Sequence, residues 1–159
     1  MNKKVCIYCN VGHFIEVFEI QLEIAQQHLD RGDSVEFLFC DGFIPICEIN
    51  IKKELETCLY CIGRRNSGIS LLKGKVSKKN LIQFTKFQDI QKVKNLRIDF
   101  NSLEDLKNYK LESFDIGQSV YSSIADIKRE HLPNIIDYKG EITKFIKAAG
   151  KIYFCMKIT

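Results

Sequence analysis

The sequence has few of the features that mark disordered, membrane-spanning or exported chains. It contains only two prolines, no internal repeat and no low-complexity segment. None of its apolar runs approaches the roughly 18 residues of a membrane span. The apolar run that ends before Asn10 is too short for the core of a signal peptide. We therefore expect a cytoplasmic protein, whose seven cysteines are reduced rather than paired in disulfides.

The composition is that of a folded protein of ordinary size. Apolar residues make up 45% of the 159 residues and charged residues 28%, which is typical of a globular chain. We expect a single domain over residues 1–159 that folds without a covalent staple. The net charge of +4 either favours an anionic partner, such as a phosphate or an acidic membrane surface, or simply keeps the surface solvated.

The first 40 residues predict a strand, a helix and a second strand. Residues 5–9 are apolar throughout, as in a strand that is buried on both faces. Apolar residues then recur at helical spacing from Phe14, and Arg31 and Gly32 are typical of a helix end. Residues 34–40 read as a strand. A helix that crosses over between two strands makes them parallel, so the sequence predicts an α/β fold with a Rossmann-like parallel sheet flanked by helices.

The remainder of the chain predicts further helices and short strands. Ser102 followed by Asp105 resembles a capping box that begins a helix. Other helices are expected over 63–72, 114–129 and 134–149, the last ended by Gly150. Short strands are expected over 81–84, 96–100 and 151–158.

Four cysteines within a segment expected to form a loop (residues 40–65) predict a metal site. They are Cys40, Cys47, Cys58 and Cys61, the last two forming a Cys-x-x-Cys pair. Four thiolates can hold structural zinc in a tetrahedron, and a Cys-x-x-Cys pair supplies two ligands from one turn. The spacing of the first pair is wider than in a zinc ribbon, so other interpretations stay open. The thiols could be unligated, hold an iron–sulfur cluster, or form a redox pair.

The turn after the first strand is the candidate ligand site. Ligands of open parallel sheets bind beyond the carboxyl ends of the strands. Asn10, Gly12 and His13 occupy that place, and the following helix directs its first amides there. We predict that these three residues bind substrate, that His13 acts as a base and that Glu16 orients it. Alternatively, His13 only caps the helix or faces solvent. The absence of a Gly-x-Gly-x-x-Gly motif argues against a tight dinucleotide site.

A second group of polar residues lies on the helix expected over 114–129. Ser122, Ser123 and Arg129 place two hydroxyls and a cation beside an apolar stripe, and we predict that they contact a polar substrate. The alternative is that the small residues of this helix permit close packing against a neighbour.

Several of these segments resemble a known family. The likeness rests on Cys40-Asp41-Gly42, on Cys47, on the run 58–65 (Cys-Leu-Tyr-Cys-Ile-Gly-Arg-Arg) and on 117–123 (Gly-Gln-Ser-Val-Tyr-Ser-Ser). These segments resemble the N-terminal region of bacterial capsule and surface-polysaccharide glycosyltransferases, over about residues 4–147. The resemblance implies one half of a GT-B enzyme, which binds a glycan or lipid-linked sugar acceptor. The nucleotide-sugar donor would be held by a second domain or subunit.

Two functional hypotheses follow. In the first, the chain is the acceptor-side domain of a glycosyltransferase-like protein, incomplete for catalysis alone because the expected donor domain is absent. Any zinc is then structural. In the second, it is a free-standing zinc-binding α/β module for a protein or nucleic-acid partner. A nucleic-acid binder would show aromatic residues interleaved with a basic face, and the sequence offers only Tyr60, Arg64 and Arg65 for this, so we favour the first.

Overall fold

The first part of the chain folds into a small parallel sheet with two helices packed against it. The computed structural model describes residues 2–9, 12 and 15–157. These residues divide into two compact units, one over 1–43 and 53–83 and the other over 44–52 and 84–159. The first unit contains β1 (Lys4–Cys9), α1 (Ile15–Asp30), β2 (Ser34–Phe39), α2 (Leu55–Ser70) and β3 (Val76–Asn80).

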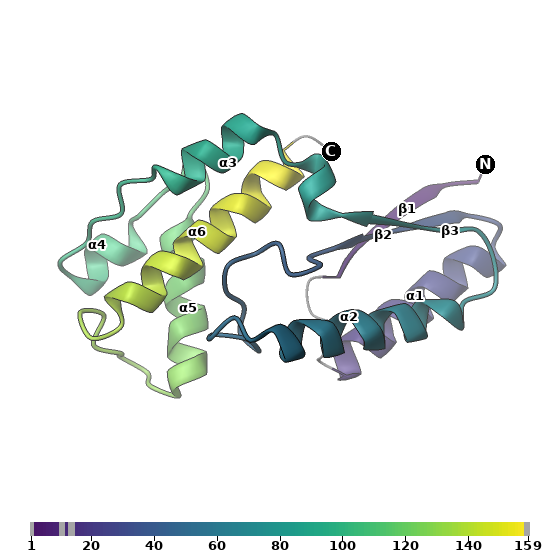
Figure 1. Cartoon of the computed structure of the whole chain (residues 1–159), viewed down its shortest axis with the longest axis horizontal. Helices are drawn as coiled ribbons and strands as arrows, with labels where there is room; N and C mark the ends of the chain where they lie inside the picture. The colour runs from purple at the N-terminus through teal and green to yellow at the C-terminus, as the bar shows by residue number, and fades with distance from the viewer. Residues whose placement is uncertain (1, 10–11, 13–14, 158–159) are drawn as a thin grey trace. The chain divides into compact units, whose positions relative to one another are not determined.

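The three strands of the first unit run parallel in the order β1-β2-β3. The predicted strand–helix–strand unit and the α/β class are therefore confirmed. Both α1 and α2 lie on the same face of the sheet (Figure 1), as expected when successive crossovers keep one hand. In a parallel sheet the carboxyl ends of all strands meet at one edge, so the segments that follow β1 and β2 lie next to each other there.

The core of the first unit lies between the sheet and its two helices. Alternate residues of β1 and β2 face the helices, with Val5, Ile7 and Cys9 level with Val35, Phe37 and Phe39. Residues spaced three or four apart on α1 complete this core: Phe18, Leu22, Ala25 and Leu29. Val17, which precedes Phe18 and also fits helical apolar spacing, is 53% exposed. The apolar face of α1 is narrower than its sequence suggests.

The opposite face of the sheet carries a charged cluster around Glu36. Its carboxylate lies 3.3 Å from the Lys4 ammonium and 3.2 Å from that of Lys79, and it accepts a hydrogen bond of 3.2 Å from the Ser77 hydroxyl. These partners come from β1 and β3, on either side of β2. Burial raises the pKa of Glu36, but the hydrogen bonds from Lys79, Lys4 and Ser77 outweigh it, so the net shift is downward. The cluster thus links all three strands.

The second unit is helical. It contains α3 (Phe87–Lys94), α4 (Leu103–Lys107), α5 (Ile116–Lys128) and α6 (Lys139–Met156), and the short 3-10 helix Leu81–Phe84 lies at the junction of the two units. Ser102 and Asp105 form the predicted capping box, in which each side chain accepts from the other residue's amide. None of the described helices combines the length and apolar character that a membrane crossing needs.

Close approach of α4 to α5 depends on Gly117. A Cβ atom at this position would lie 1.8 Å from the carbonyl oxygen of Leu106, which no side chain can accommodate. The Gly117 amide donates to the carbonyl of Tyr109 at 2.9 Å, and Leu106, Ile116 and Val120 are buried beside this contact. The end of α4 is therefore fixed against the beginning of α5.

Three predicted strands are wrong. Residues 81–84 form the 3-10 helix, and residues 96–100 form neither a strand nor a helix. The alternation of the second segment is real, since Phe100 is buried and Arg97 and Asp99 are exposed. Its carbonyls, however, accept from side chains, Arg97 from the Tyr109 hydroxyl and Phe100 from the Lys139 ammonium. Two carbonyls of the segment therefore form hydrogen bonds with side chains instead of with a neighbouring strand.

The third wrong strand, over 151–158, belongs to α6 as far as Met156. Gly150 does not end this helix. Its missing side chain leaves room for Val93 and Leu111, whose methyl carbons would lie 3.3 and 3.4 Å from a Cβ there. Phe154 and Cys155 then continue the buried face of α6.

The helix predicted over 63–72 begins earlier, at Leu55, and so includes the Cys-x-x-Cys pair. Its buried residues are Cys61, Arg65 and Ile69, spaced four apart. An arginine at the centre of this stripe hides it from a search for apolar spacing. β3 also escaped prediction, because the sequence Val-Ser-Lys-Lys-Asn holds a single apolar residue. Lysines are common on edge strands, where they oppose unwanted pairing with other chains.

The Glu36 cluster predicts a pH-dependent stability. We expect Glu36→Gln to lower the free energy of unfolding by up to about 1 kcal/mol at pH 7, a modest value because both lysines are partly exposed. The folded-state pKa of Glu36 lies below its ordinary value. The stabilisation is therefore present above the ordinary glutamate pKa and lost as pH falls through the lower folded value. Urea denaturation from pH 7 to pH 3 measures this; a difference between the two proteins that does not shrink with acid would contradict it.

Gly117 provides a test of packing in the second unit. Gly117→Ala forces α4 and α5 apart, and we expect it to destabilise the unit by about 3 kcal/mol or more, at the upper end of overpacking effects. Gly140→Ala is the matched control, because nothing lies within 4 Å of a Cβ at that helical position. It should be neutral or stabilise by up to about 1 kcal/mol. Thermal unfolding compares the two; equal melting temperatures would show that the close approach is wrong.

Candidate functional site

The candidate site lies at the carboxyl edge of the sheet, where β1 and β2 end. Cys9 ends β1 and is buried, and Gly12 lies buried in the turn that follows. Cys40 and Asp41 follow β2 directly. From the helical layer, α2 contributes Arg65. The site is therefore built from two strand ends and one helix of the same unit.

Gly12 packs directly against α2. Its amide donates a hydrogen bond of 3.2 Å to the sulfur of Cys61. A Cβ atom at Gly12 would lie 3.0 Å from the carbonyl oxygen of Cys61 and 3.2 Å from the Cβ of Arg65. One neighbour is a backbone atom of α2 and the other is a Cβ atom bonded directly to that backbone, so neither can move aside easily. Glycine is required here by the closeness of α2.

Arg65 is the most unusual residue of the site. It is 1% exposed, and its guanidinium lies 4.0 Å from the centroid of the Phe39 ring. Its terminal nitrogen forms an ion pair with the carboxylate of Asp41. An isolated buried charge would be strongly unfavourable, and both the carboxylate and the ring face offset it. The Nε atom of Arg65 is buried, and none of the described residues forms a hydrogen bond with it. The guanidinium therefore retains an unused donor.

The segment after β2 takes a tight conformation to bring Asp41 to this arginine. Asp41 has φ of 41°, in the left-handed region that aspartate tolerates better than most residues. Gly42 follows with φ of 74°, and its carbonyl accepts a hydrogen bond from the Lys53 ammonium. The turn is thus held at two points. Among the described residues, the charged groups held by this turn are the Asp41 carboxylate, the Arg65 guanidinium and the Lys53 ammonium.

The two helices behind the edge are also joined. Arg64, next to Arg65 on α2, forms an ion pair of 3.0 Å with Glu19 on α1. Farther along, Gly68 lies so close to α1 that a Cβ there would be 2.6 Å from a ring carbon of Phe18. The beginning of α1 is therefore positioned by α2 as well as by the sheet.

The structure brings together only part of the predicted substrate site. Gly12 lies at the edge as predicted, while Asn10 and His13 are outside the described residues. Glu16 is exposed in the first turn of α1. The proposed catalytic roles of His13 and Glu16 thus stay predictions. Sequence reasoning missed Asp41 and Arg65 as a pair, although the spacing of Cys61, Arg65 and Ile69 could have shown that Arg65 faces the core.

The other predicted substrate residues lie in the second unit. The Ser122 hydroxyl donates to the carbonyl of Gln118 at 3.1 Å, and that of Ser123 donates to the Glu48 carboxylate at 3.0 Å. Arg129 is exposed and ends α5 with φ of 55°. These contacts give each residue a structural role, and their part in substrate binding stays a prediction.

The four cysteines do not share one loop. Cys40 follows β2, whereas Cys58 and Cys61 lie on α2, so that part of the prediction is corrected. Cys47 belongs to the second unit, where it bridges to Asn50. Among the described residues, no group of three or more histidine, cysteine or acidic side chains is placed to hold a metal ion. Structural zinc on these thiolates stays a prediction, and metal analysis of the protein beside a Cys58→Ser, Cys61→Ser variant tests it.

Comparisons with known proteins add no relative to this description. No protein family, no curated protein and no solved structure matches the chain.

The close packing of Gly12 predicts that the site depends on this residue. We expect Gly12→Ala to destabilise the first unit by about 1–3 kcal/mol, because the added carbon meets α2. Gly63→Ala on α2 is the matched control, since nothing lies within 4 Å of a Cβ there. That change should stabilise by about 0.5–1 kcal/mol. Urea denaturation compares the variants; if Gly12→Ala were as stable as the control, the turn would not be packed as described.

Proposed function

We propose that this chain is the acceptor-side domain of a glycosyltransferase-like protein that acts in the synthesis of capsule or surface polysaccharide. The observation that carries the proposal is the arrangement at the carboxyl edge of the sheet. Gly12 is buried after the end of β1, and the buried Arg65 pairs with Asp41, which lies just after the end of β2. Open parallel sheets bind ligands at this edge, whatever their chemistry.

The chemistry of the edge suits the polar head of an acceptor. The first amides of α1 lie just after the Gly12 turn, and helix amino termini favour oxyanions. The Arg65 guanidinium is buried, so its role is to position Asp41, whose side chain is 31% exposed, and Lys53 adds an exposed ammonium beside Gly42. A phosphate or sugar hydroxyl of an acceptor would find donors here, with Asp41 as an acceptor for hydroxyl protons.

The likeness to surface-polysaccharide glycosyltransferases supports the same assignment, since it includes Asp41, Cys61 and Arg65. By that likeness the nucleotide-sugar donor is held by a second domain or subunit, and the residues described here bind the acceptor. The acceptor is a glycan or a lipid-linked sugar. The wide distribution of the cysteines gives no specific support to the alternative of a free-standing zinc module.

Amide chemical shifts test the proposal directly. We expect an oligosaccharide with a short alkyl phosphate tail to shift the resonances of Gly12, Gly42 and Cys61, and UDP-glucose to leave them unchanged. Gly63→Ala should keep this response, whereas Asp41→Asn should weaken it by about tenfold, or 1.4 kcal/mol. A response of these residues to UDP-glucose alone, or none to the acceptor analogue, would overturn the proposal.

A further inference from the structure

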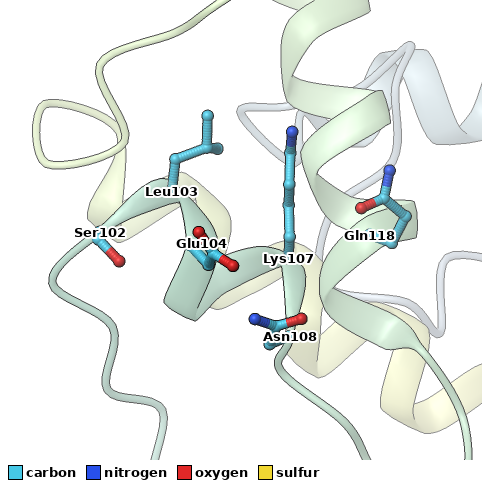
Figure 2. A pocket seen from close by; sticks show the side chains of 6 residues that line it. All are labelled: Ser102, Leu103, Glu104, Lys107, Asn108 and Gln118. Carbon is cyan, nitrogen blue, oxygen red and sulfur yellow. The ribbon is translucent and has the colours of Figure 1, made fainter.

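The second unit contains an open, shallow groove between α4 and α5. Its volume is about 620 Å³, within the range of sites for small molecules. Figure 2 shows its lining, in which the Lys107 side chain rises between Glu104 on α4 and Gln118 on α5. The lining residues are Ser102, Leu103, Glu104, Lys107, Asn108 and Gln118.

The walls of this groove are held rigidly. At one end the capping box of Ser102 and Asp105 fixes the first turn of α4. At the other end Gly117 brings α5 against the carbonyl of Leu106. The ammonium of Lys107 lies 4.2 Å from the centroid of the Tyr121 ring on α5, so this long side chain also spans the two helices. The backbone of the groove is therefore preformed, while its exposed side chains would lose rotamer freedom when a ligand binds.

Three of the six lining residues carry planar polar groups, and all three are exposed. Glu104 contributes a carboxylate, and Asn108 and Gln118 contribute carboxamides. Within the described part of the chain, no hydrogen bond holds these three side-chain groups. A carboxamide offers donors and an acceptor side by side, and a carboxylate accepts through two oxygens. Such groups match neighbouring hydroxyls, each of which both donates and accepts.

The charges of the groove restrict its ligand. Glu104 and Lys107 are its only ionised side chains among the lining residues, and their charges cancel. A strongly anionic ligand would meet the carboxylate, and a cationic one would meet the ammonium. We propose that this groove binds a neutral polyhydroxylated ligand of the carbohydrate class through Glu104, Asn108 and Gln118.

This inference goes beyond the proposed function, because it concerns the second unit and rests only on the lining of the groove. The two fail independently. Gly12→Ala alters the edge of the sheet in the first unit and leaves every lining residue of the groove in place. Saccharide binding at the groove is therefore expected to persist in that variant.

Saturation-transfer NMR and calorimetry with the full chain test the groove. The probes are glucose, N-acetylglucosamine and maltose, with glucuronate and glucosamine as charged comparisons. We expect saturable binding of at least one neutral saccharide with a Kd of about 1–10 mM, which is ordinary for a small shallow site. Its charged counterparts should bind at least fivefold more weakly.

A double variant, Asn108→Ala with Gln118→Ala, should weaken this binding at least tenfold. Ser119→Ala is the matched control, since Ser119 is exposed on α5 and its hydroxyl turns back to the carbonyl of Asp115. Circular dichroism checks the fold, and Gln118→Ala alone replaces the double variant if the latter unfolds. Unchanged affinity in the folded variant, equal binding of charged sugars, or no saturable neutral saccharide would each overturn the proposal.

Discussion

The buried ion pair between Arg65 and Asp41 is the interaction on which the first unit depends. It joins the middle of α2 to the segment that follows β2. The backbone of α2 next to Arg65 also packs against Gly12, in the turn that follows β1. A charge as deeply buried as Arg65 is tolerated only with a partner, so the turn at Asp41 must keep its left-handed conformation. The guanidinium of Arg65 thus fixes the turn at Asp41 against α2, and Cys61 on the same helix fixes the Gly12 turn.

A small number of side chains fixes the conformation of the carboxyl edge of this sheet. Phe39 supplies a ring face under the arginine, and Cys61 supplies a sulfur that accepts the Gly12 amide. Each of these groups satisfies a buried polar neighbour without adding a net charge. The edge that results presents the partly exposed carboxylate of Asp41 and the exposed ammonium of Lys53, which can bond to a sugar carrying hydroxyl or phosphate groups.

Much of the fold can be predicted from the sequence where local pattern and burial agree. The apolar run at Val5 and the helical spacing from Phe18 to Leu29 indicate β1 and α1, and parallel pairing follows from their order. The capping box at Ser102 is equally local. Prediction fails where the buried residues are polar or are glycines. Arg65 hides the core face of α2, and Gly150 resembles a helix end but serves packing. The residues before Asn101 alternate in burial without forming a strand.

The candidate site was predictable to a smaller extent for the same reason. The rule for parallel sheets points to Gly12, but the partner of Asp41 is set by the helical packing of α2, and periodicity analysis does not expect an arginine in a core. The cysteines illustrate the converse. Their proximity in sequence suggests one metal loop, whereas the described structure distributes them over a strand end, a bridge segment and a helix.

A double-mutant cycle on the ion pair tests this account most directly. Arg65→Met keeps the apolar stem without the charge, and Asp41→Asn keeps the shape of the carboxylate without its charge. If the pair holds the edge together, unfolding in urea should give a coupling energy of about 2 kcal/mol between the two changes. A coupling energy below about 0.5 kcal/mol would mean that the two residues act independently and that the edge is held by other contacts.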